Sequence, residues 1–246
     1  MQEFFLQNPE CLYKKCGYAD LRVGGIQPCT LLDYPNYLSA VIFCQGCPWS
    51  CRYCYNPHLQ PFMNTQYEWR KVLSFLATRR GRLEAVVFSG GEPLLQPDLI
   101  HAIHEVKRLG FKVALHSGGF SPYHFALVLP YVDWVGLDVK ALPKNYSKIT
   151  GVPQSGFCAW ECVKLLLKSG VSYECRTTIH SLLHTEQEIE VIARRLHQMG
   201  VRNYVIQHFQ EKGSIDKELI QKRADFILNE QLVEELNTLF NNFTIR

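Results

Sequence analysis

Short apolar segments alternate with segments of helical periodicity through most of the chain, and this alternation limits the folds that the sequence can adopt. The segments predicted as strands are 38–43, 84–88, 111–115, 134–139, 171–178 and 203–208. The segments predicted as helices are 67–78, 97–109, 122–129, 158–168 and 186–199. Apolar strands joined by helices form a parallel sheet with helices on its outer face. The pattern predicts an α/β fold, either an incomplete barrel or an open doubly wound sheet.

The composition and charge exclude several classes of protein. Hydrophobic residues make up 47% of the chain and charged residues 20%, as in ordinary globular proteins. The 26 Lys and Arg nearly balance the 23 Asp and Glu, which argues against a nucleic-acid partner. The sequence begins without a signal-peptide pattern and has no apolar stretch of the roughly eighteen residues that span a membrane. We therefore expect a cytoplasmic protein that binds neither nucleic acid nor membrane.

Cysteines, glycines and charged residues follow successive predicted strands. A cysteine-rich segment follows the first strand, SGGEP (89–93) the second and HSGGF (116–120) the third, while Asp138 and Lys140 lie at the end of the fourth. Ligand sites in both barrels and open parallel sheets lie at the carboxyl ends of the strands. We therefore predict that these motifs form one site.

The cysteine-rich segment has the spacing of an iron–sulfur site. Of the ten cysteines, Cys44, Cys47, Cys51 and Cys54 lie close together, and the last three form a C-x3-C-x2-C pattern. In a reducing compartment such a group binds metal or performs redox chemistry more often than it forms disulfides. Structural zinc sites usually take their cysteine pairs from segments farther apart, whereas iron–sulfur clusters use compact runs. Because Cys44 continues the strand, we expect three ligands and one iron with an open coordination position.

Two of these motifs resemble the radical S-adenosylmethionine (SAM) superfamily. Cys47-x3-Cys51-x-Tyr53-Cys54 matches the cysteine motif of that superfamily, including the aromatic residue before the third cysteine. The sequence Gly-Gly-Glu-Pro at 90–93 occupies the place of its SAM-binding motif after the second strand. The resemblance implies a partial (β/α)6 barrel over 21–213, with an N-terminal extension at 1–20 and a C-terminal helical segment at 214–246 packed on the core.

Further motifs narrow the resemblance to activating enzymes of glycyl-radical enzymes, most of all those of anaerobic ribonucleoside-triphosphate reductase. They are FCQGCPWSC (43–51), NPHLQP (56–61), VVFSGGEPLLQP (86–97), GLDVKA (136–141) and ECRTTIH (174–180). The similarity covers roughly 21–208. It implies one [4Fe-4S] cluster, bound SAM and a low-potential electron donor such as flavodoxin or ferredoxin. In this family, reductive cleavage of SAM gives methionine and a 5′-deoxyadenosyl radical, which takes hydrogen from a backbone glycine of the partner.

The resemblance also implies roles for residues around the cysteines. Cys47, Cys51 and Cys54 are expected to ligate the cluster, and the SAM contacts fall into four groups. These are Gly90, Gly91 and Glu92 for the methionine amino group, Lys140 and Arg176 for its carboxylate, Asp138 and His208 for the ribose, and Tyr53 for the adenine. Glycines at such a turn permit a close backbone approach to a ligand.

The chain departs from its relatives at two places. Tyr55 stands where many relatives have a histidine after the third cysteine, so a role for that histidine in shielding the cluster is not expected here. The turn at 116–119 (HSGG) lacks the carboxylate with which pyruvate formate-lyase activating enzymes contribute to a cation site. The sequence therefore gives no support for a monovalent cation.

Several alternatives remain open from the sequence. Asp138 and Lys140 could form an ion pair at the barrel rim, and Arg176 and His208 could pack there without contacting a ligand. The enzyme could instead act on another glycyl-radical enzyme or on a different substrate. In a different class of function, all four clustered cysteines could close a structural zinc site in an interaction module. The remaining cysteines, for which core packing is the simplest account, are Cys11, Cys16, Cys29, Cys158, Cys162 and Cys175.

Overall fold

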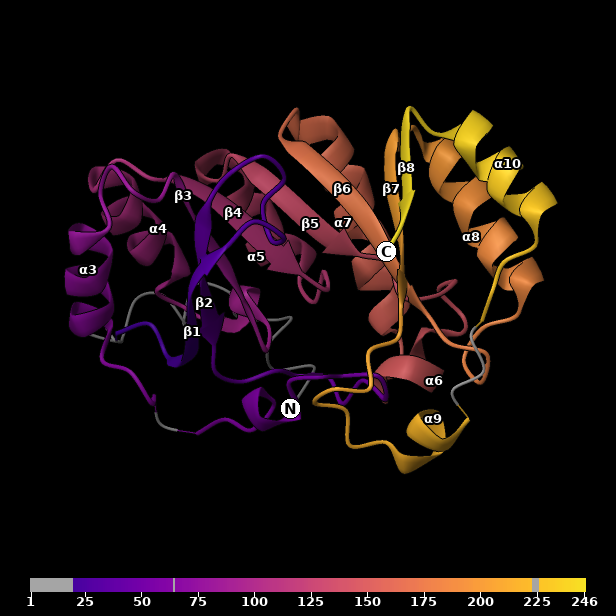
Figure 1. Ribbon diagram of the computed structural model, residues 1–246, viewed down its shortest axis with the longest axis horizontal. Coiled ribbons are helices and arrows are strands. Elements are labelled where there is room, and N and C mark those ends of the chain that lie inside the picture. Colours follow the sequence, from indigo (N-terminus) through magenta and orange to yellow (C-terminus); the bar gives the residue numbers. More distant parts are fainter. Residues whose placement is uncertain (1–19, 64, 223–225) are drawn as a thin grey trace.

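A computed structural model describes residues 20–63, 65–222 and 226–246 and places them around one curved sheet (Figure 1). The described residues form eight strands in the order β1 to β8. The strands are β1 (Val23–Thr30), β2 (Ser39–Cys44), β3 (Ala85–Gly90), β4 (Lys112–Ser117), β5 (Trp134–Asp138), β6 (Ser172–Ile179), β7 (Asn203–His208) and β8 (Asn242–Ile245). β1 pairs antiparallel with β2, and every later neighbour pair is parallel. The sheet therefore has two edges and does not close.

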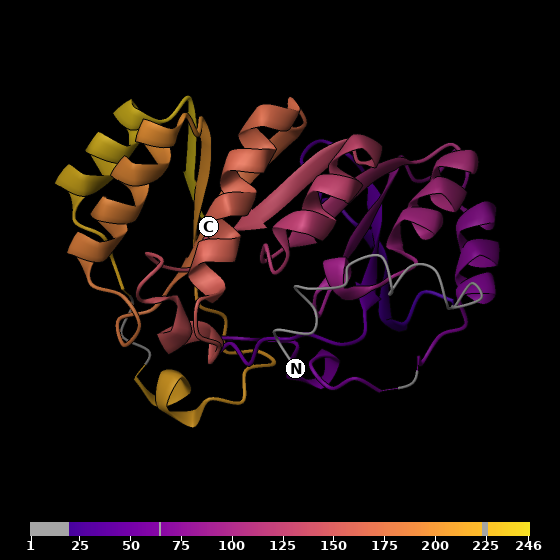
Figure 2. The same cartoon turned by 180° about the vertical axis from the view of Figure 1, so that it is seen from behind.

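Helices connect the parallel strands. They are α3 (Trp69–Thr78), α4 (Leu99–Arg108), α5 (Pro122–Val128), α6 (Tyr146–Thr150), α7 (Ser155–Ser169), α8 (Glu186–Met199), α9 (Lys217–Gln221) and α10 (Glu230–Leu239). Most of them lie on one side of the sheet, whereas α6 and α9 lie below it in Figure 1 (Figures 1 and 2). Short 3-10 helices occupy Pro57–Leu59, Pro93–Leu95 and Leu129–Tyr131. The partial (β/α) barrel predicted from the sequence is confirmed.

Local sequence signals define the helix ends and the buried helix faces. The Thr185 hydroxyl accepts a hydrogen bond from the Glu188 N–H, and the Glu188 carboxylate accepts one from the Thr185 N–H, which forms a capping box at the start of α8. α8 ends at Gly200, whose φ of 102° suits a glycine. In α4, Leu99, Ala102, Ile103 and Val106 recur at helical spacing and are all buried.

The apolar core has a layer on each face of the sheet. The larger layer lies under the helices and includes Phe88, Leu115 and Phe125, which are fully buried. A smaller layer on the opposite face contains Val41, Val87 and Trp134. Alternate residues of a strand point to opposite faces, so β2 to β5 contribute side chains to both layers. The sheet thus forms a rigid support for the loops at its carboxyl edge.

The first part of the chain fits the predicted arrangement where it is described. The turn-rich sequence at 22–36 is typical of a hairpin-like lead-in, and β1 forms a hairpin with β2. The sequence did not show that β1 joins the main sheet. The predicted N-terminal extension at 1–20 lies outside the described residues except for Asp20. No helix in the described ranges is long and apolar enough to cross a membrane.

The prediction of a helical C-terminal segment is wrong for its last residues. α9 and α10 are short and separate, and the chain then enters β8, which pairs parallel with β7. The helical pattern continues past α10 because Phe240 and Phe243 also point toward the core. Their rings lie 4.9 and 6.1 Å from that of Tyr204 in β7. The helical spacing of apolar residues therefore extends beyond α10 into β8. There, packing against β7 favours a strand over a helix.

Candidate functional site

The loop that follows β2 carries the three cysteines of the predicted motif. Cys47, Cys51 and Cys54 are free thiols and partly exposed, whereas Cys44 is fully buried at the end of β2. The N–H of Cys54 donates to the carbonyl of Cys51 at 3.0 Å, which turns this part of the loop. The structure therefore separates Cys44, a core residue, from the three cysteines that reach the surface of the site.

Backbone hydrogen bonds fix this cysteine loop (45–56) on two sides. On one side, the N–H groups of Gly46 and Cys47 donate to the carbonyls of Leu59 and Gln60 at 2.8 and 3.0 Å. On the other side, the N–H of Ser50 donates to Thr150 at the end of α6 at 3.0 Å. The aromatic side chains between the cysteines point into the core, with Trp49 only 3% and Tyr53 only 5% exposed.

The glycines of the turn after β3 allow this turn to lie directly on the cysteine loop. The N–H of Gly91 donates to the carbonyl of Cys44 at 2.9 Å, and the N–H of Glu92 donates to Gly46 at 3.0 Å. A Cβ at Gly91 would lie 2.3 Å from the Gly46 carbonyl oxygen, and Gly90 has a φ of 113°. The close approach that requires glycine here is between two parts of the chain, whereas the sequence suggested an approach to the ligand.

Glu92 is buried and joins the turn after β3 to the turn after β4. Its carboxylate accepts hydrogen bonds from the Ser117 hydroxyl at 2.8 Å, the Gly118 N–H at 2.9 Å and the Leu94 N–H at 3.1 Å. Burial raises the pKa of Glu92, while these three donors oppose the rise. Glu92 therefore fixes the turn and supplies a carboxylate to the turn at 116–119, which has none of its own.

We expect Glu92→Gln to lower the free energy of unfolding by about 1–3 kcal/mol near neutral pH, because an amide cannot accept all three hydrogen bonds. The folded-state pKa of Glu92 lies above its unfolded value, so the wild-type chain gains stability as the pH falls through the folded pKa. The difference between variant and wild type should therefore be larger near pH 5 than near pH 8. Urea unfolding at both pH values measures it. The exposed Glu68→Gln is the control and should show neither effect.

A buried cation lies beside the cysteine loop. Lys140 Nζ is 2.8 Å from Asp138 Oδ2, and it lies 5.8 and 5.6 Å from the centres of the Trp49 and Tyr53 rings. Burial alone lowers the pKa of Lys140, but Asp138 and the neighbouring Tyr53 and Cys51 raise it well above its ordinary value. Asp138 and Lys140 thus form the ion pair at the barrel rim that was one of the alternatives from the sequence, and the lysine keeps its positive charge.

Arg176 lies on the same sheet face as Asp138, in the register position beside it, but its side chain is already paired. Its Nε donates to Glu174 Oε1 at 2.7 Å, its Nη2 lies 3.1 Å from His116 Nε2, and its guanidinium lies over the Trp134 ring. Glu174 also pairs with Arg246. Burial, followed by the Arg176 charge, lowers the pKa of His116 well below its ordinary value, which favours a neutral ring.

Neither Glu174 nor Trp49 was predicted from the sequence as a site residue. Glu174 could have been found from strand periodicity, because it lies two residues before Arg176 and shares its sheet face. Trp49 lies between two cysteines, and only the folded loop shows that its ring faces Lys140. His208 is partly buried at the end of β7, where its N–H donates to the Arg246 carbonyl at 2.8 Å. No described contact joins His208 to the cysteine loop.

Two of the four other described cysteines have the buried environment expected of packing residues, and Cys29 does not. Cys162 and Cys175 are buried, Cys158 is partly exposed and Cys29 is exposed, whereas Cys11 and Cys16 lie outside the described residues.

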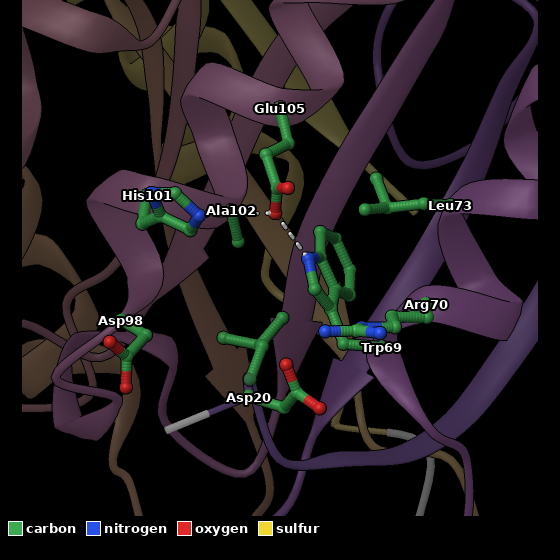
Figure 3. A pocket seen from close by; sticks show the side chains of 9 residues that line it. Asp20, Trp69, Arg70, Leu73, Asp98, His101, Ala102 and Glu105 are labelled. Atoms are coloured by element: carbon green, nitrogen blue, oxygen red, sulfur yellow. Dashed lines mark hydrogen bonds and ion pairs between the residues drawn. The ribbon is translucent and has the colours of Figure 1, made fainter. Parts of the chain in front are cut away.

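A separate pocket between α3 and α4 contains none of the predicted site residues (Figure 3). There Trp69 Nε1 donates to Glu105 at 2.6 Å, with Asp98 and His101 nearby in the lining.

Cys44 lies apart from the three partly exposed loop cysteines, because it is buried in the core. Across the described ranges, no three Cys, His, Asp or Glu side chains, including those of the loop, converge as ligands of one ion. Burial raises the pKa of Cys51 to about 11, and the nearby Lys140 ammonium opposes the rise because a positive charge favours the thiolate. The buried hydroxyl of Tyr53 has no hydrogen-bond partner among the described residues, which leaves a polar group for a bound ligand.

Residues 41–196, which include the cysteine loop, match the model of the radical SAM superfamily. The chain belongs to the radical SAM superfamily. Members of this superfamily use a [4Fe-4S] cluster and SAM, and the free thiols, buried lysine and unpaired tyrosine hydroxyl of the site fit these cofactors.

Relatives within the radical SAM superfamily include activating enzymes. A Methanocaldococcus jannaschii protein named as a glycyl-radical enzyme activating enzyme is 32% identical over 80% of this chain and 83% of its own length. The pyruvate formate-lyase-activating enzyme of Clostridium pasteurianum is 32% identical over 55% of this chain and 60% of its own length. The chain is therefore an enzyme of the glycyl-radical activating class.

Solved radical SAM structures share the fold at low sequence identity. QueE from Escherichia coli has a TM-score of 0.58 at 16% identity, with 98% of this chain and 99% of that chain covered. Streptococcus suis SuiB, solved with bound SAM, has a TM-score of 0.62 at 14% identity. The match covers 82% of this chain but only 48% of SuiB, so this chain spans about half the length of that protein. These likenesses support the partial barrel.

Proposed function

We propose that this enzyme generates a glycyl radical on an anaerobic ribonucleoside-triphosphate reductase. The observation that carries the proposal is the cysteine loop at the carboxyl edge of the sheet, in a chain whose relatives are named as glycyl-radical activating enzymes. The choice of reductase rests on the motifs at 43–51, 86–97 and 174–180, which resemble the activating proteins of that enzyme.

We propose Cys47, Cys51 and Cys54 as the cluster ligands. When bound, the reduced cluster supplies the electron that cleaves SAM. Lys140 is buried against the loop and keeps its positive charge, which suits it to hold the methionine carboxylate and to offset the negative charge of the thiolates. The Tyr53 hydroxyl offers a buried hydrogen-bonding group in the same place, beside the adenine in our assignment.

The remaining assignments are weighed by the contacts that each residue already makes. Asp138 is proposed to hold the ribose, and its side chain is partly exposed while paired with Lys140. Arg176 and His208 are proposed as secondary contacts, since Arg176 would have to share its guanidinium with Glu174. Gly90, Gly91 and Glu92 present the backbone of their turn to the methionine amino group, and the buried Glu92 carboxylate acts by fixing that turn.

A low-potential protein such as flavodoxin or ferredoxin is proposed as the electron donor. The cysteine loop is partly exposed, as transfer of an electron from a docked protein requires. The three cysteines must remain reduced until they bind iron, and we therefore propose that the enzyme works in the cytoplasm.

The test is transfer of the radical to the partner. The reconstituted enzyme, SAM, dithionite and an anaerobic ribonucleoside-triphosphate reductase are mixed without oxygen, and electron paramagnetic resonance is recorded. We expect a glycine-centred radical that requires SAM and disappears when the radical glycine of the reductase is replaced by alanine. A parallel sample contains pyruvate formate-lyase. A radical only on that protein would overturn the choice of partner, and no radical on either would overturn the proposed activity.

A further inference from the structure

An ion pair connects the cysteine loop to the segment that follows β7. Arg52 lies between Cys51 and Tyr53, and its Nε donates to Asp216 Oδ2 at 2.7 Å. Its Nη2 lies 3.3 Å from Asp216 Oδ1 and 2.8 Å from Glu218 Oε2. One guanidinium therefore spans two carboxylates from a part of the chain more than 160 residues away.

The geometry of the pair restricts how Arg52 can move. The two bonds to Asp216 form the forked arrangement in which a planar guanidinium meets a carboxylate, and such pairs have more directional preference than a lysine contact. Asp216 is itself fixed, because its Oδ1 also accepts the N–H groups of Glu218 and Leu219 at 3.1 Å at the start of α9. The side chains are only partly exposed, at 33% for Arg52 and 18% for Asp216, so water screens the pair incompletely.

The segment that supplies Asp216 is anchored to the core and to the loop itself. Leu219 in α9 is fully buried, and its carbonyl accepts a hydrogen bond from His180 Nε2 at 3.0 Å, just after β6. Before α9, Gly213 lies against the residue that follows Cys54. A Cβ at Gly213 would be 2.3 Å from the Tyr55 carbonyl oxygen, and its φ is 91°. The lower edge in Figure 1 shows α9 below the carboxyl end of the sheet.

Arg52 is thus held through both its backbone and its side chain. Its N–H donates to the Ile149 carbonyl of α6 at 3.1 Å. Its guanidinium contacts Asp216 at the start of α9, a segment distant in the sequence. The flanking Cys51 and Cys54 are joined to each other by one local hydrogen bond and are partly exposed. A loop that must present thiols to a cluster needs such support from residues that do not bind it.

We propose that Arg52 and Asp216 form a positioning clamp, through which the segment after β7 holds Cys51 and Cys54 in the arrangement that receives the cluster. The inference rests on the proposed cluster ligands. Arg52 and Asp216 are positioning residues in this scheme and bind neither cofactor. The clamp gives a role to the chain beyond β7, whose function the motifs did not explain.

The first test uses the enzyme without its cluster, so it does not depend on activity. Hydrogen exchange is measured under anaerobic conditions for Arg52→Ala and Asp216→Asn. Asparagine at 216 keeps an oxygen that can cap α9 but loses the charge that pairs with Arg52. We expect exchange of the peptide covering 47–55 to accelerate roughly 3- to 10-fold in both variants, with the strands unchanged. Arg52→Lys should fall between them and wild type.

Arg194→Ala is the matched control. Arg194 in α8 is an exposed arginine that also has two carboxylate partners, Glu190 at 2.9 Å and Glu235 at 2.7 Å, and it lies outside the cysteine loop. Its loss should leave exchange at 47–55 unchanged. Equal exchange of this peptide in Arg52→Ala, Asp216→Asn and wild type would overturn the clamp. Faster exchange of every peptide in the variants would also overturn it, since that would indicate only general loss of stability.

A second test separates failure of the clamp from failure of the proposed ligands. Each variant is reconstituted with iron and sulfide, and the cluster signal is followed by absorbance and by electron paramagnetic resonance after reduction. We expect Arg52→Ala to lose its cluster in air several-fold faster than wild type and Arg194→Ala to match wild type. A wild-type chain that binds no cluster would refute the ligands. A cluster equally stable in wild type and Arg52→Ala would refute the clamp alone.

Discussion

Replacement of Cys51 by alanine is expected to remove the [4Fe-4S] cluster signal and to reduce the yield of 5′-deoxyadenosine by more than roughly 100-fold. Mutation of residues that only support the ligands of a metal site already lowers metal affinity or activity by about 10- to 100-fold. Cys51 lies between Cys47 and Cys54 on a loop that has no other free thiol at the surface. Without one of the three proposed ligands, the cluster would lack a sufficient attachment to the loop. Iron and sulfide per chain, together with SAM cleavage under dithionite, measure the effect.

Cys44→Ala is the matched control within the same motif. Cys44 is fully buried and packs in the core at the end of β2, so its loss removes a small apolar group. We expect a decrease in stability of about 1–2 kcal/mol with the iron content unchanged. If Cys44→Ala and Cys51→Ala lost iron equally, the assignment of three ligands on the loop would be wrong. One zinc per chain, with no iron, would instead support the closed zinc site.

The strands that carry the site could be predicted because each is a short apolar run bounded by turns. The predicted strand at 203–208 coincides with β7, and the predicted helix at 186–199 coincides with α8. The end of the chain was predicted less well. Phe240 and Phe243 continue the spacing of α10, and only the packing of both rings against Tyr204 shows that the helix has ended. A helical period cannot reveal a neighbour that is distant in sequence.

The order of the motifs predicted which residues meet, but not how their side chains pair. Asp138 and Lys140 are two positions apart, so their ion pair could be weighed in advance. Arg176 also belongs to the predicted carboxyl edge, yet its contacts with Glu174 and His116 depend on the register of β4, β5 and β6. Register is a property of the assembled sheet, and the sequence of a single strand does not reveal it. The same limit applies to Arg52, whose partner Asp216 lies in a segment without a recognisable motif.

Gly90→Ala is expected to lower the free energy of unfolding by roughly 3–5 kcal/mol, the second large effect that the structure predicts. A Cβ at this position would lie 2.4 Å from the Cys44 nitrogen and 2.6 Å from its carbonyl oxygen, and both atoms belong to the backbone of β2. Neither can move aside as a flexible side chain could. The φ of Gly90, 113°, adds strain for any residue with a side chain. Anaerobic urea unfolding of the cluster-free chain measures the loss.

Gly110→Ala separates the two causes of this loss. Gly110 also has a positive φ, 92°, but a Cβ there would meet nothing within 4 Å. Its substitution should therefore cost only the backbone strain, about 1–2 kcal/mol. Equal losses in the two variants would show that β3 and β2 do not approach as closely as the structure indicates. If Gly90→Ala is the less stable by 2 kcal/mol or more, the turn after β3 must shift away from Cys44. The hydrogen bonds from Gly91 and Glu92 to Cys44 and Gly46 would then be weakened, and the chain should bind less iron even where it remains folded.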